Sequence, residues 1–226
     1  MQEMKSFLKE YLSKRHEIIN SDNRSRLVNR NLTLICSNCM GGILYHWLGM
    51  RFNSPFINCY LTNNDYVLML EHWKDFLNAD LVEDDSGDES YPVGKGYLGI
   101  RIHFLHYTTF AEAIEKWNER KTRIDMHKTV FMFTDYADSR GGYSLLERFD
   151  RLPFKYKVVF TGEKYPKLQS AVHLKGYKNF SGIFRKLVRQ VPNIWMTQNY
   201  ITGKRFIDQF DYVSWFNTVS EEEKDG

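Results

Sequence analysis

The sequence is poor in cysteine and proline, and neither sign of charge is in strong excess. Only 3 Cys and 5 Pro occur among its 226 residues, and the formal net charge is +3. So few cysteines exclude a disulfide framework and are typical of chains kept in a reducing compartment. A charge this close to zero does not indicate a nucleic-acid partner, for which a strongly basic face is expected.

Long hydrophobic runs are lacking as well. No stretch approaches the roughly 20 apolar residues of a transmembrane helix, and residues 1–20 have no apolar core of a secretory signal peptide. These absences predict a cytoplasmic protein. No Pro- or Ser-rich linker divides the chain, so we expect a single domain over residues 1–226.

Within that domain we expect an N-terminal amphipathic helix in residues 1–30, a first half over 31–127, a second half with a C-terminal helix over 128–217, and a charged tail over 218–226. The apolar side chains of the first helix, such as Phe7 and Tyr11, alternate with both acids and bases. This near balance of charge favours a helix packed on the domain. Peripheral contact with the inner face of a membrane is the alternative.

Aromatic residues, in contrast, are abundant, at 15% of the chain. Most are expected in the core, but Tyr and Trp also suit stacking on sugars and bases.

The two halves of the chain share a faint echo. Each contains an apolar run, a Gly-Gly pair, a helix-like stretch ending in Arg-Phe, a Pro-Phe pair and a second apolar run. The glycine pairs are Gly41-Gly42 and Gly141-Gly142. This order predicts two pseudo-repeated β-α-β units, and hence an α/β fold with a mostly parallel sheet flanked by helices. Nine positions separate Gly42 from Arg51 but only six separate Gly142 from Arg148, so the halves are not interchangeable copies.

Apolar periodicity and turn residues place the remaining elements. Thr108 or Thr109 is the expected N-cap of one helix. The expected strands are 32–36, 56–61, 99–105, 130–134, 156–161 and 171–174, and the expected helices are 4–19, 65–77, 110–121, 143–149, 180–190 and 204–217.

The stretch Asn38–Gly42 follows the first expected strand and is the first candidate site. Gly41 and Gly42 allow close backbone approach, and a helix start after them suits a phosphate or carboxylate. Tyr45 and His46 come one turn later. A tight strand-to-helix turn without a ligand is an equally good interpretation. Cys39 could act as a nucleophile, whereas a redox dithiol with Cys36 is disfavoured because the C-x-x-C spacing alone is a weak signal.

Asp135 and Asp138 follow the corresponding strand of the second half. They could hold a divalent cation on a diphosphate or supply a general base. A helix cap is the alternative role for such an Asp.

Basic and imidazole side chains supply further candidates. His103 and His106 are three apart and point to opposite sides of a regular strand, which disfavours joint metal ligation, and no metal site is predicted from them. His106, beyond the strand end, is the better site residue. Arg120 and Arg123 lie on a helix end, where they either stabilise the helix C-terminus or neutralise phosphates.

Four blocks of residues together resemble a bacterial family labelled exopolysaccharide biosynthesis proteins, whose reaction is not established. The resemblance extends from about residue 32 to residue 217 and implies a role in making capsule-type polysaccharide. It singles out Asn38, Cys39, Gly41, Gly42, His106, Tyr107 and Trp117. The blocks are Asn38–Gly42 with Tyr45, Phe52–Pro55, His106–Arg120 and Phe210–Trp215.

We therefore expect a glycosyltransferase that uses a nucleotide sugar, with a divalent cation as a further expected component. The substrate would be a small molecule or a glycan. A non-catalytic component that binds carbohydrate or a partner in the same pathway is the alternative. The candidate catalytic residues are Asp135, Asp138, His106 and Cys39, and the candidate ligand-binding residues are Asn38, Gly41, Gly42, Tyr45, Tyr107, Trp117, Arg120 and Arg123.

Overall fold

The fold is organised around a parallel sheet, sheet A. The computed structural model describes residues 2–135, 142–178 and 193–219. In this part of the chain four parallel strands pair in the order β1-β5-β6-β7. Their bounds are Thr33–Cys36 (β1), Thr129–Thr134 (β5), Lys157–Thr161 (β6) and Ala171–His173 (β7).

Both faces of sheet A are buried, so its central strands are apolar throughout. Side chains of a strand alternate between faces. Leu34 and Cys36 therefore enter one core with Met132, while Ile35 and Phe133 enter the other. The continuous apolar runs of the sequence thus mark strands covered on two sides.

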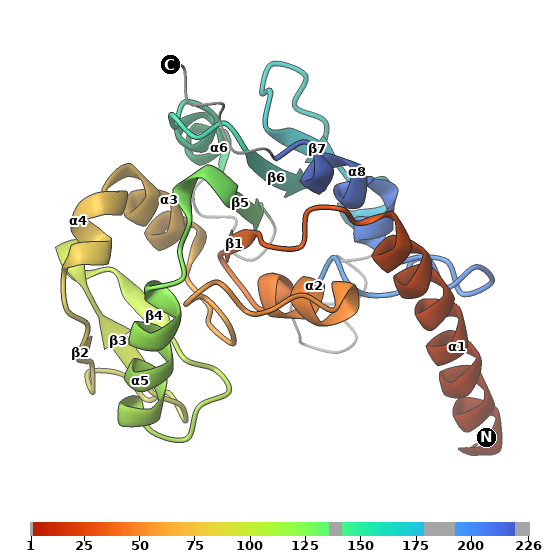
Figure 1. Ribbon diagram of the computed structural model, residues 1–226, viewed down its shortest axis with the longest axis horizontal. Helices are drawn as coiled ribbons and strands as arrows, with labels where there is room; N and C mark the ends of the chain where they lie inside the picture. The colour runs from red at the N-terminus through yellow and green to blue at the C-terminus, as the bar shows by residue number, and fades with distance from the viewer. Residues whose placement is uncertain (1, 136–141, 179–192, 220–226) are drawn as a thin grey trace.

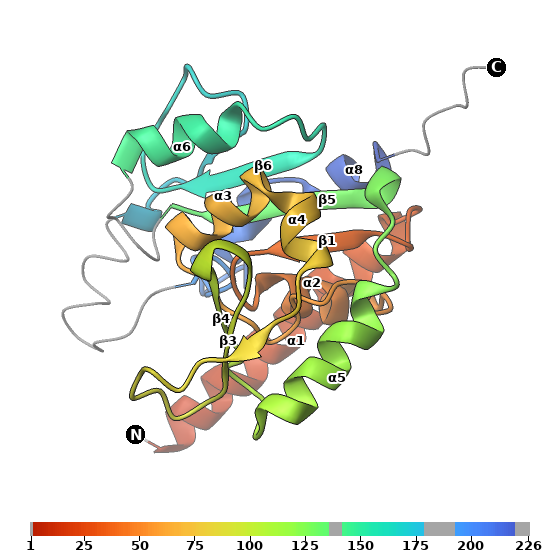
Figure 2. The ribbon, with the colours of Figure 1, turned by 90° about the vertical axis from the view of Figure 1, so that its left-hand side faces the viewer.

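Helices cover each face of sheet A (Figures 1 and 2). The first core is closed by α2, α8 and the end of α1, and the second by α3, α4 and α6. The helical elements are α1 (Gln2–Arg26), α2 (Met40–Leu48), α3 (Asn63–Glu71), α4 (Trp73–Asn78), η1 (Tyr97–Gly99), α5 (Phe110–Lys121), η2 (Met126–Lys128), α6 (Gly142–Asp150), η3 (Phe206–Gln209) and α8 (Tyr212–Asn217).

A small antiparallel sheet, sheet B, lies beside the main layers together with α5 (Figure 1). Its strands are β2 (Val82–Glu83), β3 (Val93–Lys95) and β4 (Arg101–His103). Trp117 of α5 joins this part to the second core, since its ring meets those of Phe56 at 4.9 Å and Phe104 at 6.3 Å.

The long helix α1 packs against the C-terminal part of the chain from Tyr11 onward. The Asn23 side-chain amide donates to the Tyr212 hydroxyl at 2.8 Å, and the Tyr11 hydroxyl donates to the carbonyl of Ile201. Residues from the two ends of the sequence are therefore neighbours, while the start of α1 extends away from the sheet (Figure 1). Within the described residues, no helix is both long and apolar enough to cross a bilayer.

Most of the expected elements are confirmed, including a parallel sheet flanked by helices. Thr109 is the N-cap of α5, because its hydroxyl accepts from the backbone N–H of Glu112 at 3.2 Å. The second β-α-β unit is present as β5, α6 and β6. The expected helix 65–77 is two helices that meet at His72, and the helix expected over 204–217 is η3 followed by α8. The helix expected over 180–190 lies outside the described residues.

The strand expected over residues 56–61 is wrong. Asn58 has a φ of +62°, which interrupts an extended chain. The N–H of Leu61 donates to the carbonyl of Ser37, and Tyr60 forms a single bridge with His103 near sheet B. This segment links the two sheets, so the first half lacks a second strand in sheet A and the duplication of β-α-β units is not confirmed.

Candidate functional site

A cavity of about 740 Å³ opens at the start of α2, next to the carboxyl end of β1. Five separate stretches of the described chain contribute to its wall. Of the residues selected from the sequence, Asn38, Cys39, Gly42, His106 and Arg120 line it. The other described residues of the lining are Ile43, His46, Trp47, Phe52, Ile57, Asn58, Tyr60, Leu105, Asn193 and Trp195.

One stripe of α2 faces this cavity. Cys39, Gly42, Ile43 and His46 recur at intervals of three or four residues, which is the spacing of one helix face. The opposite stripe is buried in the first core. Gly49, with a φ of +63°, ends the helix in the left-handed conformation that glycine adopts most easily.

Asn38 precedes the N-cap of α2 and its buried side chain contacts the first turn of the helix. Its side chain is only 9% exposed, and its Oδ1 accepts from the backbone N–H of Met40 at 3.0 Å. Asn38 also lines the cavity, and its amide nitrogen makes no hydrogen bond to another described residue. Together with the N–H groups that the first turn of any helix leaves unpaired, this amide makes the end of the cavity rich in donors.

Arg120 supplies the cation of the cavity and is held in place by two aromatic rings. Its Nη1 donates to the Tyr107 hydroxyl at 2.8 Å, and its guanidinium lies 5.8 Å from the centre of the Phe52 ring. The Tyr107 hydroxyl in turn donates to the carbonyl of Ile57 at 3.3 Å. Tyr107 therefore positions Arg120 and does not itself line the cavity.

Among the described residues of its wall, the cavity has formal charge of one sign only. Arg120, His46 and His106 line it, and no carboxylate occurs among the described residues of its wall. The positive end of the α2 dipole adds to this field. An anionic group with donors on one side and a guanidinium on the other fits such a site.

Cys39 lines the cavity as a half-buried free thiol. Burial raises the pKa of this thiol, so the neutral form is favoured at neutral pH. Cys36 and Cys59 are fully buried and free, and burial raises the pKa of each. A redox dithiol of Cys36 with Cys39 therefore gains no support from the geometry.

Several residues selected from the sequence serve the fold around the cavity. Gly41 lies inside the first turn of α2 against Cys36, so it does not form the loop that the sequence suggested. The Tyr45 hydroxyl donates to the carbonyl of Leu32 at 2.9 Å and accepts from the N–H of Leu34 at 2.8 Å.

Trp117 and Arg123 also lie outside the cavity wall. Trp117 is buried in the second core. The Nη1 of Arg123 donates to the carbonyl of Phe52 at 2.8 Å, and its Nη2 pairs with Glu119. Arg123 therefore supports the segment that carries Phe52.

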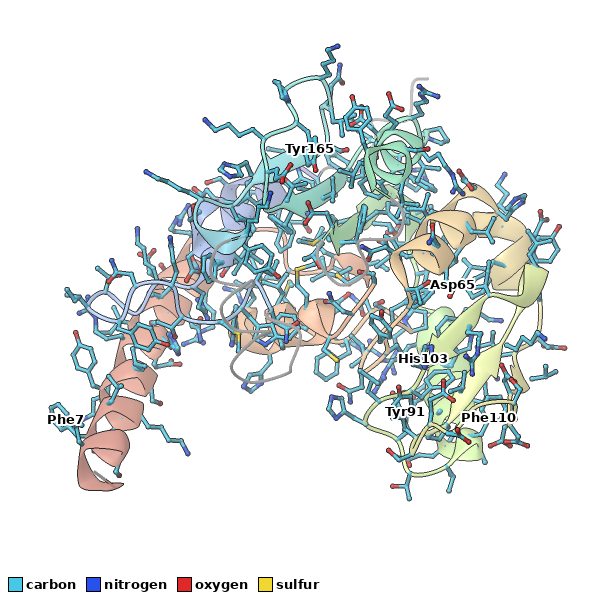
Figure 3. All side chains as sticks on the ribbon, turned by 180° about the vertical axis from the view of Figure 1, so that it is seen from behind. Phe7, Asp65, Tyr91, His103, Phe110 and Tyr165 are labelled. Atoms are coloured by element: carbon cyan, nitrogen blue, oxygen red, sulfur yellow. The ribbon has the colours of Figure 1, made fainter. Side chains whose placement is uncertain are left out.

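Asp135 lies at the carboxyl end of β5 and is not part of the cavity wall. Its Oδ2 accepts from the N–H of Gly162 at 3.3 Å, while its buried Oδ1 has no partner among the described residues. Burial raises the pKa of this carboxyl to about 7. Its neighbours include Glu163 and Tyr165, and Figure 3 shows Tyr165 far from His103 and sheet B.

The structure does not bring Gly41, His106 and Asp135 together in this cavity, because of the three only His106 lines it. Asp138 lies outside the described residues. In the ranges 2–135, 142–178 and 193–219, no cluster of three or more His, Cys, Asp or Glu side chains is arranged to hold a metal ion.

Sequence reasoning missed much of the cavity wall. His46 could have been predicted as a wall residue, since it lies on the same face of the helix as Cys39 and Gly42. Trp47 lies next to a recognised block and Phe52 begins one, but the side that Trp47 faces depends on the exact phase of α2, and the side that Phe52 faces depends on the chain that follows this helix. Asn193 and Trp195 come from an irregular segment with no periodic pattern, and no signal in the sequence indicates them.

Comparison with known proteins places the chain in a family. Residues 11–217 match the family described as "Domain of unknown function (DUF1919)". The chain is also 37% identical over 213 residues to a Haemophilus influenzae protein described as an uncharacterised protein. That alignment covers 93% of this chain and 96% of the relative, so nearly the whole fold is shared. The chain therefore belongs to the DUF1919 family.

Proposed function

We propose that the cavity binds a nucleotide sugar and that the chain is a glycosyltransferase of surface-polysaccharide assembly. The observation that carries the proposal is the donor-rich start of α2 opposite Arg120, in a cavity without carboxylates among its described wall residues. A diphosphate matches that charge. The volume of the cavity, about 740 Å³, lies within the range of roughly 300–1,000 Å³ that is typical of small-molecule sites.

The aromatic walls suit the rest of such a ligand. Phe52 and Trp195 line the cavity, and aromatic rings of this kind stack on a base or a sugar. Transfer would break the bond between the anomeric carbon and the phosphate oxygen. Arg120 and the N–H groups at the start of α2 would stabilise the charge that develops on the departing diphosphate.

A second candidate function is binding without catalysis, by a component of the same pathway. The absence of carboxylates from the described part of the cavity wall favours it, because Asp135, the expected base, lies elsewhere. A transferase would then depend on an imidazole, His46 or His106, as its base.

Isothermal titration calorimetry with uridine, guanosine, cytidine and thymidine diphosphate sugars tests the proposal, with and without Mg²⁺ or Mn²⁺. We expect binding of at least one, and weakening by about 10- to 100-fold in Arg120→Gln, because a charge-assisted hydrogen bond contributes roughly 1.5–3 kcal/mol. Lys116→Gln is the matched control, since this lysine also belongs to α5 but does not line the cavity. No binding of any nucleotide sugar at millimolar concentration would refute the proposal.

A further inference from the structure

A second cavity, of about 690 Å³, lies between α1 and α2. Lys9, Ser13, Glu17 and Asn20 of α1 line one side of it. His46 and Trp47 line the other side, and both residues also line the first cavity. The two cavities therefore share one wall, formed by the last turn of α2.

Trp47 is fixed within this shared wall. The guanidinium of Arg205 lies 3.5 Å from the centre of its ring, and Arg205 is completely buried. Arg205 is held by Asp208 at 2.8 Å and by the Oδ1 of Asn20 at 2.9 Å. The indole cannot easily turn, so the two cavities are bounded by a preorganised aromatic surface.

The second cavity differs from the first in charge. Lys9 and Glu17 bring opposite charges, and Ser13, His16 and Asn20 add hydrogen-bonding groups; burial lowers the pKa of His16, which favours its neutral form. Such a lining suits a neutral, hydroxyl-rich ligand better than a second anion. The apolar C–H face of a sugar ring packs on an indole, while its hydroxyls reach the polar groups around it.

We infer that this second cavity binds the acceptor glycan of the transfer reaction, an inference that rests on the proposed function. An acceptor sugar on Trp47 directs a hydroxyl toward the imidazole of His46, at the border with the donor cavity. His46 takes the hydroxyl proton as the acceptor oxygen bonds to the anomeric carbon. The bond from that carbon to the phosphate oxygen breaks, and the nucleoside diphosphate leaves with the electron pair.

The test uses labelled full-length protein on an array of purified bacterial oligosaccharides. Ser13→Trp fills the second cavity from an exposed position of α1, and Ser21→Trp is the matched control on the same helix, outside both cavities. We expect the parent protein and Ser21→Trp to bind a common set of glycans, and Ser13→Trp to bind them at least about tenfold more weakly. Thermal melting of both variants checks that they are folded.

The outcomes separate the two proposals. Ser13→Trp should keep the nucleotide-sugar affinity of the parent protein in calorimetry, and His46→Gln should lose about 100-fold or more of the transfer rate to an array glycan. If glycan binding is lost in Ser13→Trp while no nucleotide sugar binds, the proposed donor fails and the glycan site stands. If the parent protein binds no glycan, or Ser13→Trp binds as the parent does, the inference is overturned.

Discussion

At the scale of single residues, Asp135 is the most perturbed acid of the described structure. Its carboxyl is mostly buried at the end of β5, with one hydrogen bond from the N–H of Gly162 and no partner for Oδ1 among the described residues. Desolvation outweighs that single bond and raises the pKa of the carboxyl to about 7, well above the ordinary value of an aspartate. The folded protein therefore holds a proton here that the unfolded chain releases at a lower pH.

This difference makes stability depend on pH in a defined direction. Between about pH 4 and pH 7 the folded state binds more protons at Asp135, so this group lowers the free energy of unfolding as the pH rises through that range. The slope is at most about 1.4 kcal/mol per pH unit. Asp135→Asn removes it, so we expect the variant to gain stability over the parent from pH 5 to pH 7 and then keep a constant difference.

Urea unfolding at pH 5, 6, 7 and 8 measures that difference. Glu10→Gln is the control, because a hydrogen bond from Lys14 lowers the pKa of this exposed carboxyl of α1, and Glu10 is not among the charges that act on Asp135. A stability difference between Asp135→Asn and the parent that stays flat from pH 5 to pH 8 would contradict the prediction.

At the scale of elements, the first turn of α2 contains two glycines in different surroundings. A Cβ on Gly41 would lie 3.1 Å from Cys36 Sγ, whereas a Cβ on Gly42 would lie 3.5 Å from its nearest neighbour, Ile57 Cγ2. Cys36 is fully buried in β1 and has little room to move. Gly41 is therefore required for the packing of α2 on the sheet, and Gly42 for the shape of the cavity.

We expect Gly41→Ala to be less stable than Gly42→Ala by about 1–3 kcal/mol, the cost of overpacking a core. Gly42→Ala should equal or exceed the parent, because alanine is up to about 1 kcal/mol better than glycine in a helix. Denaturant unfolding of both variants measures this. In a Cys36→Ala background the cost of Gly41→Ala should shrink, and an unchanged cost there would show that the contact with the thiol is not its cause.

The elements that could be predicted from the sequence are those with a local signal. The apolar run around Leu34 predicts strand β1, and the hydroxyl of Thr109 predicts the start of α5. The run Phe56–Leu61 resembles a strand because apolar content reports burial, and a linker between two cores is buried too. The positive φ of Asn58 leaves no mark on that pattern.

The same limit applies to the candidate site. Asn38 and Cys39 could be found because ligand sites follow the strands of α/β sheets. Asp135 follows the same rule but faces Gly162 beyond the neighbouring strand. The direction in which a residue at the end of a strand points depends on the packing of distant segments. For the same reason Trp195 could not be predicted from the sequence.

At the scale of the whole molecule, buried Arg205 connects three parts of the chain. Its guanidinium pairs with Asp208, donates a hydrogen bond to the Oδ1 of Asn20 in α1, and stacks on the ring of Trp47 in α2. A buried charge is stable only with its partners in place. Buried Arg205 therefore links the N-terminal helix, the cavity wall and the C-terminal region.

We expect Arg205→Met to lower the free energy of unfolding by about 3–5 kcal/mol, because it leaves Asp208 buried and unpaired. The double variant Arg205→Met/Asp208→Asn should lose less free energy of unfolding than Arg205→Met alone. Arg151→Met, which breaks an exposed ion pair with Glu147, should cost less than about 1 kcal/mol. Chemical denaturation of the three variants decides, and similar costs for Arg205→Met and Arg151→Met would contradict the assignment.

The contacts of α1 with the far end of the chain have a consequence for synthesis in the cell. Tyr11 and Ile201 are 190 residues apart in sequence. At roughly 5–20 residues per second, the ribosome needs about 10–40 s between making the two. During that time α1 can already contact α2, but the surface that Tyr212 and Arg205 provide does not yet exist, so the packing of α1 against these two residues must be a late step of folding. If translation is stalled before residue 200, we expect α1 to stay open to proteolysis. Completion and release of the chain should then protect α1.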